Sequence, residues 1–270
     1  MKARRLRVAT WNINSLRLRL GLLADLVTAL DPDVICLQET KVPDPLFPGH
    51  GPPALGYPHV AYRGMKGYNG VAILSRLPLR RLDIAPDWCG KGDCRHIDAV
   101  VETPSGPVEI HNFYVPAGGD VADRAANPKF GHKLDFVAEA RSWFAARTGL
   151  QRVILVGDLN IAPGEHDVWS HRQLLDVVSH TQVEVEALNA WMQAGFIDAV
   201  RHFVPNTEKL YTWWSYRNRD WKVANRGRRL DHVWVTPDLR DSLHGHTILT
   251  EARDWTRGSD HVPVCVELLV

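Results

Sequence analysis

Short apolar runs recur along the chain and predict a protein rich in β-strands. Several of these runs alternate apolar with polar residues, as a half-buried antiparallel strand does. The run at 153–156 is apolar throughout, which is typical of a strand buried on both faces. We predict strands over residues 7–11, 34–38, 70–74, 99–102, 108–115, 153–156, 230–235 and 262–269.

Between these runs, apolar residues spaced three and four apart predict amphipathic helices. We expect a helix over 15–30, with Ser15 as its N-cap and Asp31-Pro32 ending it. Two more are expected over 129–147 and 184–194, the last with Gly195 as its C-cap. No linker or repeat divides the sequence. Residues 1–270 are therefore expected to form a single α/β domain with sheets at the centre and helices outside.

Composition is that of an ordinary globular protein, with 45% hydrophobic and 23% charged residues among 270. No apolar run is long enough to span a membrane, and the basic start at 1–7 has no signal-peptide core. Cys36 and Cys265 sit in apolar runs, as reduced core cysteines do. Cys89 and Cys94 could form a bridge or bind a metal, although no zinc-like spacing supports the latter. We expect a cytoplasmic protein.

The segment 153–160, Val-Ile-Leu-Val-Gly-Asp-Leu-Asn, carries the most chemical information. Side chains two apart in an extended segment point the same way, so Asp158 and Asn160 would project together from the strand's end. A carboxylate and a carboxamide in that position suit a metal ion or a reacting water. Gly, Asp and Asn are also common in turns, so this segment alone leaves the two interpretations even.

Polar residues also follow or end other predicted strands, namely Asn12, Glu39 and Tyr114. The pair Asp260-His261 precedes the last strand, whose beginning would lie beside these ends if it runs antiparallel. Each residue alone is more often a solvated loop side chain or a core tyrosine. Their shared placement favours one cluster.

Three carboxylates in one cluster would repel one another and raise their pKa values unless a cation neutralised them. Ligands that offer only oxygen, from carboxylates, carboxamides and water, suit Mg²⁺ or Mn²⁺ rather than zinc. The pattern therefore indicates metal-assisted phosphoryl chemistry.

The net charge of +1 neither requires nor excludes a polyanionic partner. The basic residues, however, gather at 217–229, where six Lys and Arg face a single acid, Asp220, with aromatic residues among and beside them. A solvated loop over buried aromatics is the plain alternative. We favour a nucleic-acid surface, because basic residues contact phosphates and aromatic residues contact bases or sugars.

With these motifs in view, the chain resembles the exonuclease III / apurinic-apyrimidinic (AP) endonuclease family throughout its length. The GDLN and SDH motifs alone indicate only the wider superfamily, which includes DNase I-like nucleases, inositol-phosphate phosphatases and sphingomyelinases. The LQETK and YTWWSY motifs favour the DNA-repair branch. The matching segments are WNINSLR (11–17), LQETK (37–41), NFYVP (112–116), GDLNIAP (157–163), YTWWSY (211–216), RLD (229–231) and SDHVP (259–263).

The resemblance implies a DNase I-like, four-layered α/β sandwich, in which helices flank two packed mixed β-sheets. It also implies a Mg²⁺-dependent phosphodiesterase that incises duplex DNA 5′ to abasic sites, with 3′→5′ exonuclease and 3′-end-trimming activity. Mn²⁺ is expected to substitute for Mg²⁺. The expected partner is double-stranded DNA with abasic sites or blocked 3′ ends, bound by a monomer that acts at the nucleoid.

The resemblance also assigns roles to individual residues. Asp158 would deprotonate the attacking water and Asn160 would position it. Tyr114 would contact the phosphate, while His261, held by Asp231, would donate to a non-bridging oxygen. The residues implied near the metal are Asn12, Glu39, Asp158, Asn160, Asp260 and His261, with Glu39 as the principal ligand.

Trp213 and Leu230 fall where the family builds an apolar pocket for a flipped-out abasic sugar, and Arg217, Arg226 and Arg228 are expected to contact DNA. Arg228 departs from the aromatic or aliphatic residue of some members, and Ser15 replaces a usual glycine. Two other functions compete: a superfamily phosphatase or phospholipase acting on an inositol or lipid headgroup, and a catalytically inert DNA-binding module.

Overall fold

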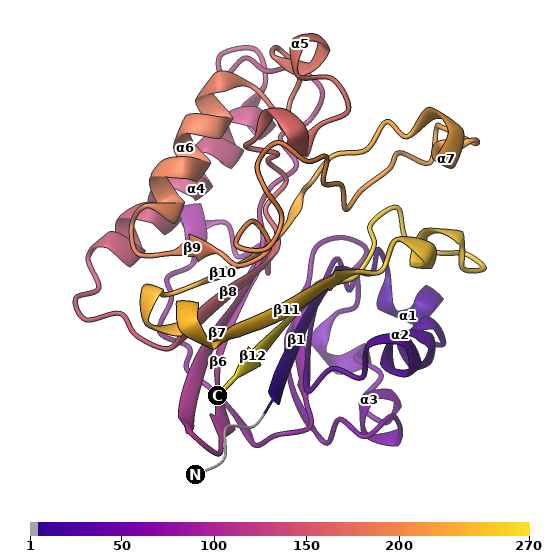
Figure 1. The fold of residues 1–270 in the computed structure, drawn as a ribbon, viewed down its shortest axis with the longest axis vertical. Helices are drawn as coiled ribbons and strands as arrows, with labels where there is room; N and C mark the ends of the chain where they lie inside the picture. The colour runs from indigo at the N-terminus through magenta and orange to yellow at the C-terminus, as the bar shows by residue number, and fades with distance from the viewer. Residues whose placement is uncertain (1–4) are drawn as a thin grey trace.

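Two six-stranded sheets pack face to face in the computed structural model (Figure 1), which describes residues 5–270. The first four residues of the basic start lie outside the described part. One sheet has the order β11-β12-β1-β2-β4-β3 and the other β5-β6-β7-β8-β10-β9. The strands of the first sheet are β1 (Arg5–Asn12), β2 (Val34–Gln38), β3 (His59–Arg63), β4 (Val71–Ser75), β11 (Leu243–Ile248) and β12 (Val264–Leu269). Those of the second are β5 (Leu79–Arg81), β6 (His96–Thr103), β7 (Gly106–Tyr114), β8 (Val153–Asp158), β9 (Ile197–Asp198) and β10 (Asp231–Val235).

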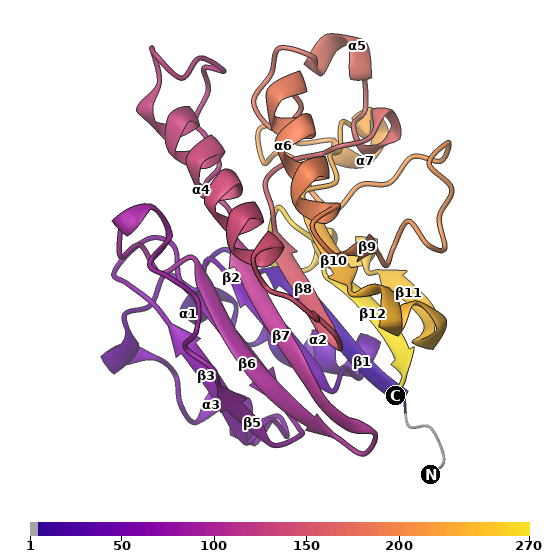
Figure 2. The same cartoon turned by 90° about the vertical axis from the view of Figure 1, so that its left-hand side faces the viewer.

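Helices cover the outer face of each sheet (Figures 1 and 2). The first sheet carries α1 (Leu16–Arg19), α2 (Leu22–Leu30) and α3 (Gly51–Ala54). The second carries α4 (Pro128–Ala145) and α6 (Gln182–Met192). Two short helices, α5 (His171–Leu174) and α7 (Trp221–Ala224), lie in the long connections. The predicted four-layered sandwich is confirmed.

Alternation along the strands divides the core into three layers. Val8 and Ile154 point between the sheets, whereas Ala9 packs toward α2 and Leu155 toward α4 and α6. Neighbouring residues of a strand point to opposite faces, so one apolar run fills two layers at once. This explains why 153–156 is apolar at every position.

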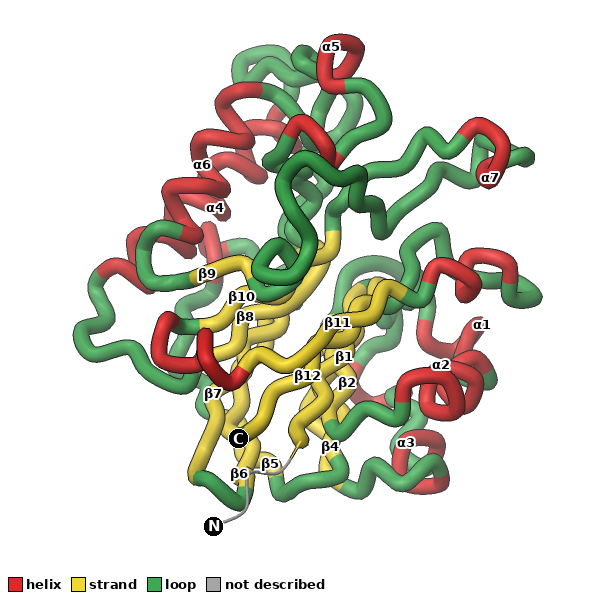
Figure 3. The backbone as a smooth tube through the Cα atoms, in the orientation of Figure 1, coloured by secondary structure: helices red, strands yellow, loops and turns green. Residues whose placement is uncertain are grey.

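The strand directions bring the ends that carry polar residues to one edge of the sandwich (Figure 1), where the strands pass into long loops (Figure 3). Strand β1 runs parallel to β2, and β7 runs parallel to β8, so their carboxyl ends lie together within each sheet. Strand β12 is antiparallel to β1, and β10 is antiparallel to β8, so their first residues lie at that edge too. The antiparallel orientation assumed for the last strand is correct.

The predicted helix over 15–30 is wrong as a single element. It is broken at Leu20-Gly21, where Leu23 N–H bonds Leu20 O and Ala24 N–H bonds Gly21 O, three residues back rather than four. Ser15 makes no capping hydrogen bond from its side chain, and its φ is 90°. A positive φ is the conformation in which glycine costs least, which accounts for the glycine expected there.

Helix α6 is shifted from its predicted limits, and the reason is its N-terminus. The hydroxyl of Thr181 accepts from Glu184 N–H, while the Glu184 side chain accepts from Thr181 N–H, which forms a capping box and starts the helix at Gln182. The helix ends at Met192, and Gly195, with φ of 141°, follows the end rather than serving as the C-cap residue.

Four strands were not predicted, namely β3, β5, β9 and β11. In the described residues, no helix is both long and apolar enough to cross a membrane. All four cysteines are free; Cys36 and Cys265 are buried, as expected.

Candidate active site

The carboxamide of Asn12 joins the two sheets at the shared edge. Its Nδ2 donates to Glu39 Oε1 at 2.9 Å and to Asp158 Oδ2 at 2.8 Å. Asn12 ends β1 and Asp158 ends β8, so one amide ties together the polar ends of strands from different sheets. The predicted cluster therefore exists.

Glu39 follows β2 and holds its carboxylate in a partly exposed position. Its Oε1 also accepts from the Tyr114 hydroxyl at 2.8 Å, and Lys41 Nζ lies 2.8 Å from Oε2. Burial alone would raise the pKa of Glu39, but hydrogen bonds from Asn12 and Lys41 bring it below its usual value. Burial and the nearby Glu39 carboxylate raise the pKa of the Tyr114 phenol well above its usual value, so the phenol stays a donor.

Asp158 is buried and bound on both carboxylate oxygens. The Asn160 backbone N–H donates to Oδ1 at 3.0 Å, and Asn160 Nδ2 lies 3.2 Å from Oδ2. Burial raises the pKa of Asp158 to about 7, despite the opposing charge of His261 and the hydrogen bond from Asn12. A carboxylate with a near-neutral pKa suits proton transfer at physiological pH.

His261 lies between two carboxylates. Its Nδ1 is 2.8 Å from Asp231 Oδ2, and its Nε2 is 3.6 Å from Asp158 Oδ2. Burial would lower the pKa of His261, but Asp231 and Asp158 raise it to about 10. The ring is therefore an imidazolium with protons on both nitrogens, able to donate. Thr212 Oγ1 donates to Asp231 Oδ2 at 2.6 Å and fixes that carboxylate.

Asp260 lies beside this group and is oriented by two donors. Asn14 Nδ2 donates to Oδ1 at 3.0 Å, and Trp213 Nε1 donates to Oδ2 at 2.9 Å. Burial would raise the pKa of Asp260, but His261 and these hydrogen bonds lower it. Asp260 is thus an ionised carboxylate at neutral pH.

The donor set fits a divalent cation. Asp158, Asp231 and His261 place possible ligand atoms within 4.8 Å of one another. A protonated imidazole has no free lone pair for a metal. His261 therefore fits the role of a hydrogen-bond donor rather than that of a metal ligand. Glu39 and Asp260, both ionised, supply oxygen ligands of the kind that Mg²⁺ and Mn²⁺ prefer.

A pocket of about 880 Å³ opens beside the cluster and is lined by four of the five predicted DNA-binding residues, Trp213, Arg217, Arg226 and Arg228. Leu230, the fifth, is buried beneath Trp213 in a small apolar cluster. The Arg228 guanidinium lies 5.5 Å from the centre of the Trp213 ring, and its Nη1 donates to Val178 O and Ser179 Oγ. Arg228 therefore forms a fixed part of the pocket wall.

Only some of the basic residues in the segment 217–229 lie at the protein surface. Arg217 and Arg226 are exposed, and Arg226 stacks over Trp169 at 4.8 Å. Arg229, counted with them in the sequence, is buried and paired with Asp167 and Asp198, so it is not available to DNA.

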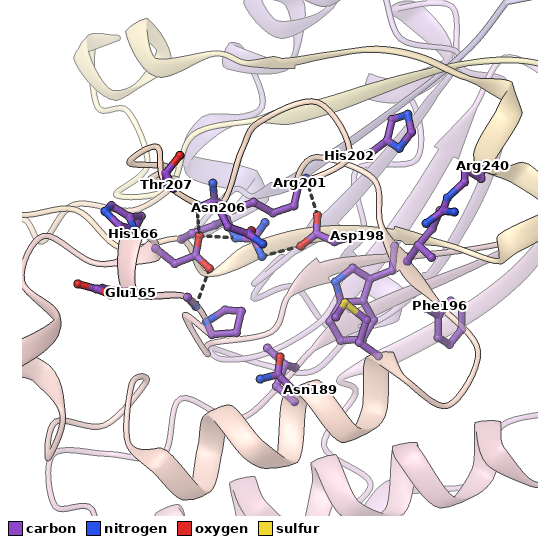
Figure 4. A pocket seen from close by; sticks show the side chains of 18 residues that line it. Glu165, His166, Asn189, Phe196, Asp198, Arg201, His202, Asn206, Thr207 and Arg240 are labelled. Atoms are coloured by element: carbon purple, nitrogen blue, oxygen red, sulfur yellow. Dashed lines mark hydrogen bonds and ion pairs between the residues drawn. The ribbon is translucent and has the colours of Figure 1, made fainter.

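A second pocket, of about 710 Å³, lies among α6, β9 and the loop at 163–167 (Figure 4). Ion pairs of Asp198 and Asp167 with Arg229 and Arg201 form part of its wall. Its lining includes none of the predicted site residues. The pocket beside the cluster is therefore the one that belongs to the candidate active site.

Several residues of the site were present in the motifs but had no predicted role. Asn14 orients Asp260 and accepts from Lys41 Nζ at 2.7 Å, so these two side chains connect Asp260 with Glu39. Thr212 fixes Asp231. Their spacing within the motifs does not reveal these contacts, because the partners lie far apart in the sequence.

Comparison with known proteins agrees with this geometry. The endonuclease/exonuclease/phosphatase family matches residues 9–261. Exodeoxyribonuclease III of Haemophilus influenzae is 31% identical over 96% of this chain and 98% of its own length. An AP endonuclease structure from Archaeoglobus fulgidus is 30% identical with a TM-score of 0.87, covering 98% of this chain and all of its own. The 3′ phosphatase NExo from Neisseria, solved with a product DNA hairpin, is 30% identical with a TM-score of 0.88, covering 97% of this chain and 99% of its own.

The chain belongs to the endonuclease/exonuclease/phosphatase family, in the group of exonuclease III and the AP endonucleases. It is a hydrolase, a nuclease of DNA repair.

Proposed function

We propose that this nuclease uses Mg²⁺ to incise duplex DNA 5′ to abasic sites, leaving a 3′-hydroxyl, and that it also trims 3′ ends. Mn²⁺ is expected to substitute. The observation that carries the proposal is the setting of Asp158, a buried carboxylate with a raised pKa, beside the His261 imidazolium and the Glu39 carboxylate. The arrangement offers a base, a cationic donor and metal ligands within one cluster.

In the proposed reaction, Asp158 accepts a proton from water while the water oxygen forms a bond to phosphorus. The bond from phosphorus to the 3′ oxygen of the preceding nucleotide breaks, and that oxygen takes up a proton from solvent water and becomes the 3′-hydroxyl. Asp158 then returns its proton to solvent. Asn160 holds Asp158 through its backbone N–H at 3.0 Å and, in this proposal, also orients the water.

Two groups stabilise the charge that develops on the phosphate. The His261 imidazolium, held by Asp231, donates to a non-bridging oxygen. The Tyr114 phenol, neutral because its pKa is raised, donates to the phosphate or the leaving oxygen.

Glu39 and Asp260 are the residues proposed to hold the metal, with Asn12, Asp158 and Asn160 as further candidates. Asn12 bonds both Glu39 and Asp158, and Asn160 bonds Asp158. A bound divalent cation would neutralise negative charge on the phosphate oxygens. The chain's own part is to keep both carboxylates ionised, which the donors around them achieve.

The pocket beside the cluster supports an abasic substrate. Trp213, backed by the buried Leu230, provides an apolar surface next to Asp260 for the proposed flipped sugar. An abasic nucleotide forfeits no base pair when it leaves the helix, so it is the least costly nucleotide to extrude. Arg217 and Arg226 are placed to contact phosphates. We further propose that the enzyme acts as a cytoplasmic monomer on nucleoid DNA.

An end-labelled duplex that carries one tetrahydrofuran abasic analogue tests the proposal. It is digested with Mg²⁺ and with chelator, beside an intact duplex, a duplex with a 3′-phosphate and an Asp158→Ala control. We expect Mg²⁺-dependent incision directly 5′ to the analogue and slower shortening from 3′ ends. The absence of metal-dependent product from every duplex would refute it.

Two results would favour the competing functions. Hydrolysis of a soluble inositol phosphate without DNA cleavage would indicate a superfamily phosphatase. Duplex binding that persists without any cleavage would indicate an inert DNA-binding module.

A further inference from the structure

Lys133 is completely buried, which is rare for a lysine, and it has no part in the cluster described above. It lies on α4, and its ammonium forms an ion pair with Glu184 of α6, which is also completely buried. Helices α4 and α6 lie side by side on the second sheet (Figure 2). The pair therefore sits at the seam between the two helices.

The ammonium of Lys133 uses all of its donors. Besides Glu184, it donates to the backbone carbonyl of Asn160 at 2.8 Å and to that of Ala117 at 3.3 Å. A lysine has three N–H bonds to donate, and each finds an acceptor here. One of them holds the backbone of a residue in the proposed reaction.

The backbone at Asn160 turns sharply after strand β8. Its φ is 54°, in the left-handed region that asparagine adopts more readily than most residues. The Asn160 side chain meanwhile donates to Val115 O at 2.9 Å and approaches Asp158 Oδ2 at 3.2 Å. The bond from Lys133 to the Asn160 carbonyl fixes the peptide that follows Asn160. It thereby restrains the Cα from which the side chain, and on the other side the backbone N–H of Asn160, reach Asp158.

Glu184 holds a second segment, the loop at 178–181. Its carboxylate accepts from Ser179 N–H and Thr181 N–H and from the Thr181 hydroxyl. The same loop supplies Val178 O and Ser179 Oγ to Arg228 in the pocket wall. One ion pair thus touches both the turn that carries Asn160 and the loop that anchors Arg228.

Helix packing alone does not account for these charges. Desolvation of two ions offsets much of their attraction, and an apolar pair of similar volume often packs as well or better. An apolar pair, however, cannot donate to the Asn160 carbonyl or accept from the loop. The contacts to Asn160 and to the loop are what the ion pair adds.

We propose that Lys133 and Glu184 are positioning residues for the nuclease reaction. Lys133 acts by fixing Asn160 and, through it, Asp158, while Glu184 acts by holding Lys133 and the loop behind Arg228. This inference rests on the proposed function of Asp158 and Asn160.

The test compares the double variant Lys133→Met/Glu184→Gln with the wild type on the tetrahydrofuran duplex. Glutamine retains an oxygen for the loop N–H groups, so the substitution removes mainly the charge pair and the donor to Asn160. We expect kcat to fall about 10- to 100-fold with little change in KM, because small misplacements of reacting groups have effects of this size. Lys129→Met, exposed on the same helix one turn earlier, is the matched control and should keep both constants.

A second measurement does not depend on activity. The side-chain amide signal of Asn160, assigned by its loss in Asn160→Ala, is followed by NMR in asparagine-labelled protein. We expect it to shift in the double variant and to stay in place in Lys129→Met. Should the double variant fail to fold, Lys133→Arg serves instead, because it keeps the charge but moves the N–H donor. We expect the same fall in kcat and the same shift of the Asn160 signal.

The outcomes distinguish a failure of the positioning role from a failure of the proposed function. A folded variant with wild-type kcat overturns the proposal, and so does a fall in kcat with an unmoved Asn160 signal. If the wild type cleaves no DNA, the proposed function fails. In that case the NMR signal alone decides whether the ion pair positions Asn160.

Discussion

Nδ1 of His261 lies 2.8 Å from Oδ2 of Asp231, and this bond leaves the other ring nitrogen 3.6 Å from Asp158. Asp231 therefore sets both the orientation of the imidazole and its charge. In Asp231→Asn, the neutral amide no longer favours the imidazolium, so the pKa of His261 should fall. We expect kcat on the abasic duplex to fall about 10²- to 10³-fold, the usual effect of losing a preorganised donor.

Asp241→Asn, on an exposed residue, is the matched control for Asp231→Asn and should retain the wild-type kcat. Circular dichroism would establish that both variants are folded. A folded Asp231→Asn enzyme with wild-type kcat would show that His261 does not act through this carboxylate.

The pH dependence of kcat/KM should show two limbs. Asp158 accepts the proton only when ionised, and burial raises its pKa to about 7, so kcat/KM should rise with pH up to that region. His261 donates only when protonated, and its carboxylate neighbours raise its pKa to about 10, so kcat/KM should fall above that region. Steady-state rates between pH 5 and 11 check this. A profile already at its maximum at pH 5 would contradict the role of Asp158.

Arg228 should influence the choice of substrate. Its guanidinium occupies the pocket wall over Trp213, where it would limit the room for the proposed flipped sugar. In Arg228→Leu, we expect the ratio of kcat/KM for the abasic duplex to kcat/KM for a 3′-phosphate duplex to rise about tenfold, within the range that pocket changes produce.

Arg226→Ala provides the comparison for Arg228→Leu, since Arg226 is exposed and is proposed to contact a DNA phosphate. This variant should weaken the binding of both substrates to the same extent. It should also reduce the slope of the salt dependence of binding by about one. An unchanged ratio in Arg228→Leu would mean that Arg228 does not shape the pocket.

Gly157 should be required for the fold near the site. Its φ is 140°, and a Cβ at this position would lie 1.9 Å from the carbonyl oxygen of Phe113 on the neighbouring strand. We expect Gly157→Ala to lower the free energy of unfolding by about 3 kcal/mol or more, because backbone cannot move aside as a flexible side chain can. Thermal unfolding measures this.

Gly21→Ala is the control for Gly157→Ala. Gly21 has helical φ and ψ, and a Cβ there would meet nothing within 4 Å. This variant should be unchanged or more stable by up to about 1 kcal/mol. Equal stability of the two variants would contradict the account of Gly157.

The sequence was sufficient to predict the layers and most of the site. All eight predicted strands are present, because burial on one or both faces leaves a clear apolar pattern. Asn12, Glu39, Tyr114 and Asp158 lie together because each ends or follows such a strand.

Other features left no local signal. Strand β3 is only half buried at most positions, and β11 mixes His, Gly and Thr with two apolar residues, so neither has a clear period. Lys133 looks like any surface lysine in the sequence, and its burial depends on Glu184, which is fifty-one residues away. The ion pairs that bury Arg229 depend on similarly distant partners.

The central claim is that Asp158 takes the proton from the attacking water. Single-turnover incision of the tetrahydrofuran duplex at saturating Mg²⁺ compares the wild type with Asp158→Asn, which keeps the shape and one acceptor oxygen but cannot accept the proton. A fall in rate of about 10²- to 10⁴-fold, with unchanged affinity for the duplex, is the result we predict. A rate within about tenfold of the wild type would contradict the claim.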